Sequence, residues 1–311
     1  MAKRLSNTQL IVFSRLTKVV QATFAAAIAL NLWTSPSLAG DPFPGREPHQ
    51  IGDKTEAAFK AIFQQGNYPA AERYLKEALS SEPNEPLAYA MRASLAYMKK
   101  DMVGLDTYSK KTLETGQKLI ATDELRGNIY TAVGHFFEGA VIYTREGTGS
   151  VPTVLGRLRQ VYEYLDKAEA ISANDPELNL LRGYMDLMLA VNLPFADPDE
   201  AIKRLETNGG PRYLVDRGIA LAYRDLKQYS QALEYANRAL KGTSENPELY
   251  YLKAQILREQ GQKEKSQALI QEAIANFDKA LTKKSQLPAS LVKQIQNERG
   301  GAVKGLAEVS R

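Results

Sequence analysis

Two side chains that could transfer a proton or bind a metal lie three residues apart, His135 and Glu138. At this spacing they share one face of a helix, where the pair could orient a proton-transfer site or donate two metal ligands. The chain has one other histidine, His49, and no cysteine, so a tight transition-metal site is not expected. We interpret the face that carries His135 as a solvated or groove-facing side of a helix.

Sequence motifs of the common enzyme classes are missing. The chain contains no Gly-x-x-x-x-Gly-Lys-Ser/Thr phosphate loop, no Gly-x-Ser-x-Gly nucleophile motif and no His-Glu-x-x-His helix. Gly147-Thr148-Gly149 has the glycine spacing of a nucleotide loop, but no predicted strand precedes it, and a turn is the simpler interpretation. The sequence therefore predicts no catalytic residue, no cofactor and no metal site.

The charge distribution argues against nucleic acid as a partner. The 311 residues carry a formal net charge of +4. That excess comes from residues 1–39, which contain Lys3, Arg4, Arg15 and Lys18 and no acidic residue. The remaining chain is balanced, whereas binding to nucleic acid or to an anionic membrane needs a clustered excess of lysine and arginine.

The first 39 residues have the three parts of a secretory signal. A basic stretch ends at Lys18, an apolar run lies within residues 19–33, and Ser37 and Ala39 place small residues before Gly40. We expect cleavage after Ala39 and export to a periplasm or an equivalent lumen, with no membrane insertion of the mature chain. An uncleaved anchor and an organellar transit peptide remain alternatives. Residues 40–52 hold three prolines and few apolar residues, which predicts an unstructured leader.

Beyond the leader, short phrases of sequence recur. Gly66-Asn67-Tyr68 is followed by Ala71, Tyr74 and Ala78-Leu79, and related phrases begin at Lys227 and at Gly261, 34 residues apart. Small residues seven apart lie on one side of a helix, where they allow two antiparallel helices to approach closely, and Gly66 or Gly261 would supply the turn between them. Such helix pairs bury their apolar faces by stacking on one another.

A second phrase begins at a proline and has a basic residue six positions later. It occurs at Pro86, Pro176, Pro211 and Pro247. Proline suits the first turn of a helix because its missing N–H would have had no partner there. The basic residues, which we call the basic ladder, are Arg92, Arg182, Arg217 and Lys253.

With these residues in place, the chain resembles the tetratricopeptide repeat (TPR) family, and more loosely the secreted TPR proteins of cyanobacteria and other Gram-negative bacteria. The resemblance implies an all-α fold, a right-handed superhelical solenoid of antiparallel helix pairs. We expect about six pairs over residues 53–286, with a degenerate region at 120–175, and a capping helix with a polar tail over 287–311. In the degenerate region, Asp123–Arg145 reads as one long helix that a second long helix follows.

The resemblance also implies where a partner would bind, because first-helix residues line the concave groove in this family. The corresponding residues here are Ser94, Tyr97, Arg217, Arg224, Tyr251, Gln255 and Arg258. The basic ladder could receive carboxylates of a peptide, or its long stems could cover apolar surface while the charged heads reach water.

We therefore expect an exported, non-enzymatic scaffold that holds an extended or helical segment of another protein in its groove. The alternative is a permanent structural or assembly subunit of an envelope or lumenal membrane complex. The sequence does not identify the partner, the compartment or the oligomeric state.

Overall fold

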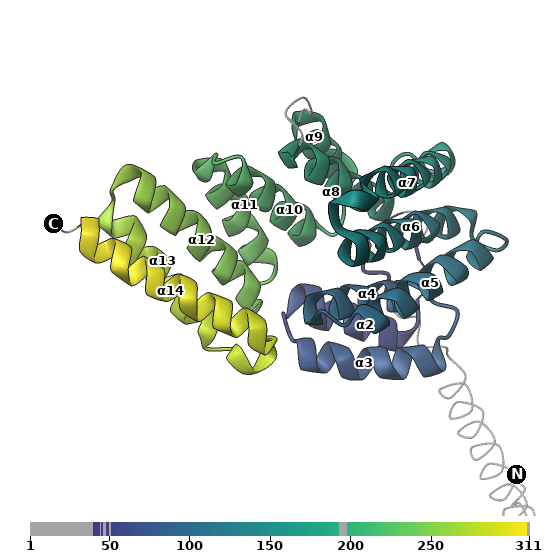
Figure 1. The fold of residues 1–311 in the computed structure, drawn as a ribbon, viewed down its shortest axis with the longest axis horizontal. Helices are drawn as coiled ribbons and strands as arrows, with labels where there is room; N and C mark the ends of the chain where they lie inside the picture. Colours follow the sequence, from purple (N-terminus) through teal and green to yellow (C-terminus); the bar gives the residue numbers. More distant parts are fainter. Residues whose placement is uncertain (1–39, 44, 46–47, 50, 193–197, 310–311) are drawn as a thin grey trace, which may run out of the picture. The chain divides into compact units, whose positions relative to one another are not determined.

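The computed structural model describes residues 40–43, 45, 48–49, 51–192 and 198–309. The expected secretory signal at 1–39 lies outside the described residues. Within the described part the chain is built from helices that follow one another in antiparallel pairs, without a β-strand (Figure 1). The prediction of an all-α, TPR-like solenoid is therefore confirmed.

Six consecutive helix pairs and one further helix make up the described chain. The first helix of each pair is α2 (Asp53–Phe59, continued by a π-helical turn at Lys60–Gln64), α4 (Pro86–Lys99), α6 (Glu124–Glu146), α8 (Pro176–Asn192), α10 (Arg212–Asp225) or α12 (Pro247–Glu264). The second is α3 (Tyr68–Ser81), α5 (Met102–Leu119), α7 (Val151–Ile171), α9 (Pro198–Asn208), α11 (Tyr229–Gly242) or α13 (Gln267–Leu281). The last helix is α14 (Ala289–Val309), which packs on α12 and α13.

The recurring prolines mark helix starts. Pro86, Pro176 and Pro247 are the first residues of α4, α8 and α12, and Pro211 stands immediately before α10. Several helices begin after a polar side chain that accepts a hydrogen bond from the first turn, which satisfies a backbone N–H that has no partner inside the helix. These caps are Asn67, Glu85, Asp101, Asp123, Asn246 and Ser266.

The small residues of the repeat lie where the helices of a pair meet. Ala71, Ala78, Ala232 and Ala239 are all fully buried. The degenerate region uses glycine for the same purpose between α5 and α6. A Cβ added to Gly134 would lie 2.6 Å from the Cα of Leu113, and one added to Gly127 would lie 2.4 Å from the backbone nitrogen of Ile120. Side chains at these two glycines would force the helices apart.

One turn differs from the sequence prediction. Gly261 was expected to supply the turn between the last two paired helices, but it lies inside α12, which continues to Glu264. Its Cβ would come within 2.8 Å of Ile270, so glycine is needed there for close packing against α13. The turn is made by Lys265, whose φ of 52° is left-handed, a conformation that Gly66 adopts in the first pair at 61°.

The leader also differs from its prediction as an unstructured segment. Among its described residues, Phe43, His49 and Ile51 are buried against the helices. The Asp41 carboxylate accepts hydrogen bonds from the backbone N–H of Phe43 and of His49, which fixes the local conformation of the segment. Prolines and polar residues indicated a loop correctly, but they gave no sign that two aromatic rings of this loop would be buried.

A contact between distant parts of the chain joins the first helix pair to the sixth. The Tyr68 hydroxyl donates to Glu248 at 2.5 Å, across 180 positions of sequence, and the Asn246 side chain donates to the Phe63 carbonyl at 3.1 Å. A Cβ on Gly66 would lie 2.6 Å from Asn246. Repeats of an open solenoid touch only their neighbours. We call this set of interactions the closing contact.

Candidate partner-binding surfaces

The basic ladder is paired within the chain. Arg182 lies 2.7 Å from both Asp166 and Glu169 of α7, and Arg217 lies 2.5 Å from Glu248 of α12. Lys253 and Arg92 each contact the second helix of their own pair. Lys253 pairs with Glu272 at 3.0 Å, and Arg92 donates to the Tyr108 hydroxyl at 3.2 Å. Three of the four bases thus already hold carboxylates of this chain, each belonging to a neighbouring helix.

The groove candidates at the N-terminal end of the chain are open to solvent. Ser94 and Tyr97 lie on α4, and the Tyr97 side chain is 56% exposed. An exposed tyrosine offers a large apolar ring with a polar end, a side chain common in protein interfaces. Both residues lie on a first helix, α4, as the resemblance implied.

The groove candidates at the other end meet one residue of α14. The hydroxyl of Tyr251 donates to Glu298 at 2.5 Å, and Gln255 and Arg258 each reach the same carboxylate at 3.1 Å. Arg224 joins the group through a 2.8 Å hydrogen bond to Gln255. Burial alone would raise the pKa of Glu298, but these polar contacts hold it below its ordinary value.

These four residues lie together in the structure, and the sequence did not reveal what they contact. Tyr251 is only 8% exposed, because α14 covers it. Arg217 is separate from the group. It pairs with Glu248, the residue that accepts the hydrogen bond of Tyr68 in the closing contact. In this structure, the C-terminal part of the predicted groove surface is therefore occupied by the chain's own last helix.

Sequence reasoning missed a second surface, at the N-terminal ends of α4, α6 and α8. Glu85 caps α4, and Glu177 lies in the first turn of α8. The ring of His49 stands between them, with Nε2 3.5 Å from Glu85 and Nδ1 3.4 Å from Glu177. His49 is 3% exposed, and its ring centre lies 5.6 Å from that of Tyr130.

A buried ionic network lies beneath His49. The guanidinium of Arg126 is 2.6 Å from Asp175 and 3.1 Å from Glu177, and the Tyr130 hydroxyl donates to the other oxygen of Glu177. Burial alone would raise the pKa of Glu177, but His49 and Arg126 hold it below its ordinary value. Burial alone would lower the pKa of His49, but Glu177 and Glu85 raise it to about 10. His49 is therefore positively charged at neutral pH.

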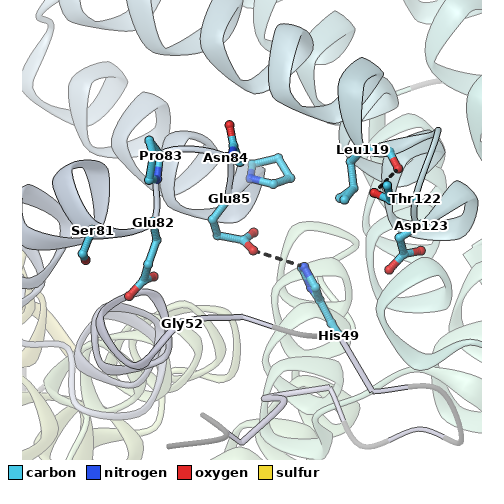
Figure 2. A pocket seen from close by; sticks show the side chains of 11 residues that line it. His49, Gly52, Ser81, Glu82, Pro83, Asn84, Glu85, Leu119, Thr122 and Asp123 are labelled. Carbon is cyan, nitrogen blue, oxygen red and sulfur yellow. Dashed lines mark hydrogen bonds and ion pairs between the residues drawn. The ribbon is translucent and has the colours of Figure 1, made fainter. Parts of the chain in front are cut away.

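Figure 2 shows the pocket that opens beside this histidine. Its volume is about 540 Å³, and two of its lining side chains, Glu85 and His49, point toward each other and are joined by their ion pair. The C-terminal ends of α3 and α5 and the N-terminal ends of α4 and α6 contribute the remaining wall. Because Glu82, Glu85 and Asp123 place three carboxylates on that wall, it suits a positively charged or neutral group better than an anion.

A sequence signal for this surface existed but was weak. Glu85 and Asp175 each precede a recurring proline, so an acidic residue stands at the start of two first helices. Acidic residues there are ordinarily read as caps, which Glu85 and Asp175 also are. Nothing in the sequence pattern connects them to His49.

His135, the histidine of the pair that first suggested chemistry, does not lie on a solvated side of α6. His135 is 5% exposed rather than solvated, because its ring packs 5.6 Å from the ring of Tyr164 on α7. Its Nδ1 lies 3.3 Å from Glu138, whose carboxylate also pairs with Arg157. In the described residues, no three histidine or acidic side chains are grouped as a metal site would require.

The comparison with protein families agrees with the repeat architecture. Residues 56–104 and 217–281 match the tetratricopeptide repeat family model. A solved structure, a thermophilic TPR protein of Thermus thermophilus, is 18% identical and aligns with a TM-score of 0.31 over 81% of this chain and 97% of its own. No curated protein matches the chain.

Proposed function

We propose that this chain is an exported, non-enzymatic scaffold that binds a segment of a partner protein on its first helices. The observation that carries the proposal is that these helices already hold two segments outside the repeating pairs. One is the leader, held through His49, and the other is α14, held through Glu298. Side chains that bind segments of their own chain through ion pairs and hydrogen bonds can bind a partner segment in the same way.

The family match supports the same class of function, because tetratricopeptide repeats generally mediate protein–protein interaction. Stacked helix pairs are rigid, so they present a surface with little loss of conformational entropy on binding. The exposed Ser94 and Tyr97 of α4 provide a part of that surface which no segment of the described chain covers.

Export is the second part of the proposal. It rests on the basic stretch, the apolar run and the small residues that end at Ala39. Among the described residues, no helix is long and apolar enough to cross a bilayer. Sequencing the N-terminus of the protein purified from its host tests this part, and the expected first residue is Gly40.

Binding is tested by site-specific photocrosslinking in the native host. A benzoylphenylalanine at Tyr97 should give a discrete adduct with one partner, because this position is exposed on a first helix. The matched control is Lys76, which is exposed on the second helix α3 and should give no such adduct. Identical adducts at both positions, or none at Tyr97, would contradict the proposal.

A further inference from the structure

The leader is held on the helices by a few side chains. The aromatic ring of Phe43 packs edge-on against Phe59 of α2 at 5.2 Å, and His49 stands between Glu85 and Glu177. Hydrogen bonds of its described backbone run to Asp41 or to residues nearby in sequence. A segment without a helix or strand ladder to the rest of the fold can open locally without unfolding the helices.

The surface beneath the leader requires a positive charge. Glu85, Asp175 and Glu177 contribute three carboxylates, and Arg126 contributes one guanidinium. Without His49 the group would hold two negative charges in excess, and of its three carboxylates Asp175 and Glu177 are buried. Leaving buried charge uncompensated is costly, so this surface favours any ligand that restores a cation.

An apolar anchor accompanies the cationic one. Phe59 is 2% exposed because Phe43 covers it, together with neighbouring side chains. Phe43 and His49 are six residues apart, and the described residues between them form no helix. The surface thus recognises an aromatic and a positively charged side chain presented by a non-helical loop, in which the backbone N–H of His49 donates to Asp41.

We propose that Phe59, Glu85, Tyr130 and Glu177 form a binding site for a non-helical partner segment, and that Phe43 and His49 occupy it as an intramolecular ligand. The partner segment carries an aromatic side chain and, about six residues later, a cation. This inference rests on the proposed function, since it specifies the chemistry of the bound segment. The adjoining pocket provides room for a lysine or arginine longer than His49.

A synthetic peptide with the sequence of residues 40–52 is the probe for this site. In the full chain carrying Phe43→Ala and His49→Ala, the site is vacated, so the labelled peptide should bind at least tenfold more tightly than it does to the wild-type chain. Fluorescence anisotropy measures both affinities, and circular dichroism confirms that the variant keeps its helicity. Equal affinities, or no binding to the helical variant, would overturn the proposal.

Two further variants identify the anchors. A peptide with His49→Glu should lose binding, whereas a peptide with His49→Arg should keep it, because the carboxylates require only a cation. If the double variant loses helicity, a second assay replaces the anisotropy measurement. Hydrogen exchange of the wild-type chain is then measured with and without an excess of the His49→Arg peptide. Exchange at Phe43 and His49 must then increase, and unchanged exchange rejects the proposal.

Failure here is distinct from failure of the scaffold function. The peptide assay needs no native partner, and the crosslinking assay uses Tyr97, which lies on α4 away from the residues of this site. The wild-type chain could also form a dimer in which each leader occupies the site of the other copy. That result would overturn the assignment of the site to a segment of a different partner.

Discussion

The charge of His49 links the docking of the leader to pH. Its pKa is 6.5 in an unfolded chain and about 10 in the structure, where burial alone would lower it but the neighbouring carboxylates outweigh that effect. A raised pKa stabilises the folded state fully below the unfolded value, and this stabilisation is lost as pH rises through the folded value. Other charged groups facing this region are Asp41 and Arg126.

The unfolded and folded pKa values of His49 set the pH range of this loss. We therefore expect the free energy of unfolding of the wild-type chain to fall between about pH 7 and pH 10. The His49→Gln variant lacks this titration and should show a smaller decline over the same range. Urea unfolding followed by circular dichroism at a series of pH values measures the difference. Parallel curves for the two proteins would show that His49 carries no such charge.

Arg126 is buried, unlike the surface cations of this chain. Its side chain is 1% exposed, and the variant Arg126→Met leaves Asp175 and Glu177 without their guanidinium. Breaking a buried pair by removing one partner costs roughly 3–5 kcal/mol, the loss we expect in urea unfolding. The control is Lys118→Met on α5, whose pair with Glu114 is exposed and should contribute less than about 1 kcal/mol.

At the scale of single helices, two kinds of glycine should respond oppositely to alanine. Gly300 and Gly301 lie inside α14 with no atom within 4 Å of an added Cβ, so alanine should stabilise the helix by about 0.5–1 kcal/mol at each. Gly134→Ala should instead destabilise the protein by about 1–3 kcal/mol, because its Cβ would meet the backbone of α5. Thermal unfolding distinguishes the two signs.

Helix positions were predictable from the sequence to the extent that they depend on local pattern. The long helix expected at 123–145 is α6 at Glu124–Glu146, and the recurring prolines start their helices as predicted. Periodicity also placed Ala239 and its equivalents in the core. It misplaced the last turn, because glycine serves both close packing and left-handed backbone, and Gly261 has the first role while Lys265 takes the second.

The sites were less predictable because they depend on contacts between unrelated segments. Tyr251, Gln255 and Arg258 shared a helix face as expected, yet no pattern indicated that Glu298 of α14 would bind them. The role of His49 depends on residues 36 to 128 positions away, which periodicity does not report.

At the scale of the whole chain, the closing contact should make the first and sixth pairs unfold together. Gly66→Ala would introduce a Cβ 2.6 Å from Asn246 and break this coupling. Hydrogen exchange measured by mass spectrometry should then show faster exchange in both α3 and the start of α12. Gly147→Ala is the control, since Gly147 also has a positive φ but nothing lies within 4 Å of its Cβ. Unchanged protection of α12 in Gly66→Ala would contradict the coupling.

The closing contact also sets an order of events during biosynthesis. Synthesis and export both deliver the N-terminal pair first, but Tyr68 can contact Glu248 only after 180 further residues have emerged. Until then the turn at Gly66 remains without its cover, and the early repeats rely on their neighbours alone. Folding should therefore be complete only after α12 has emerged.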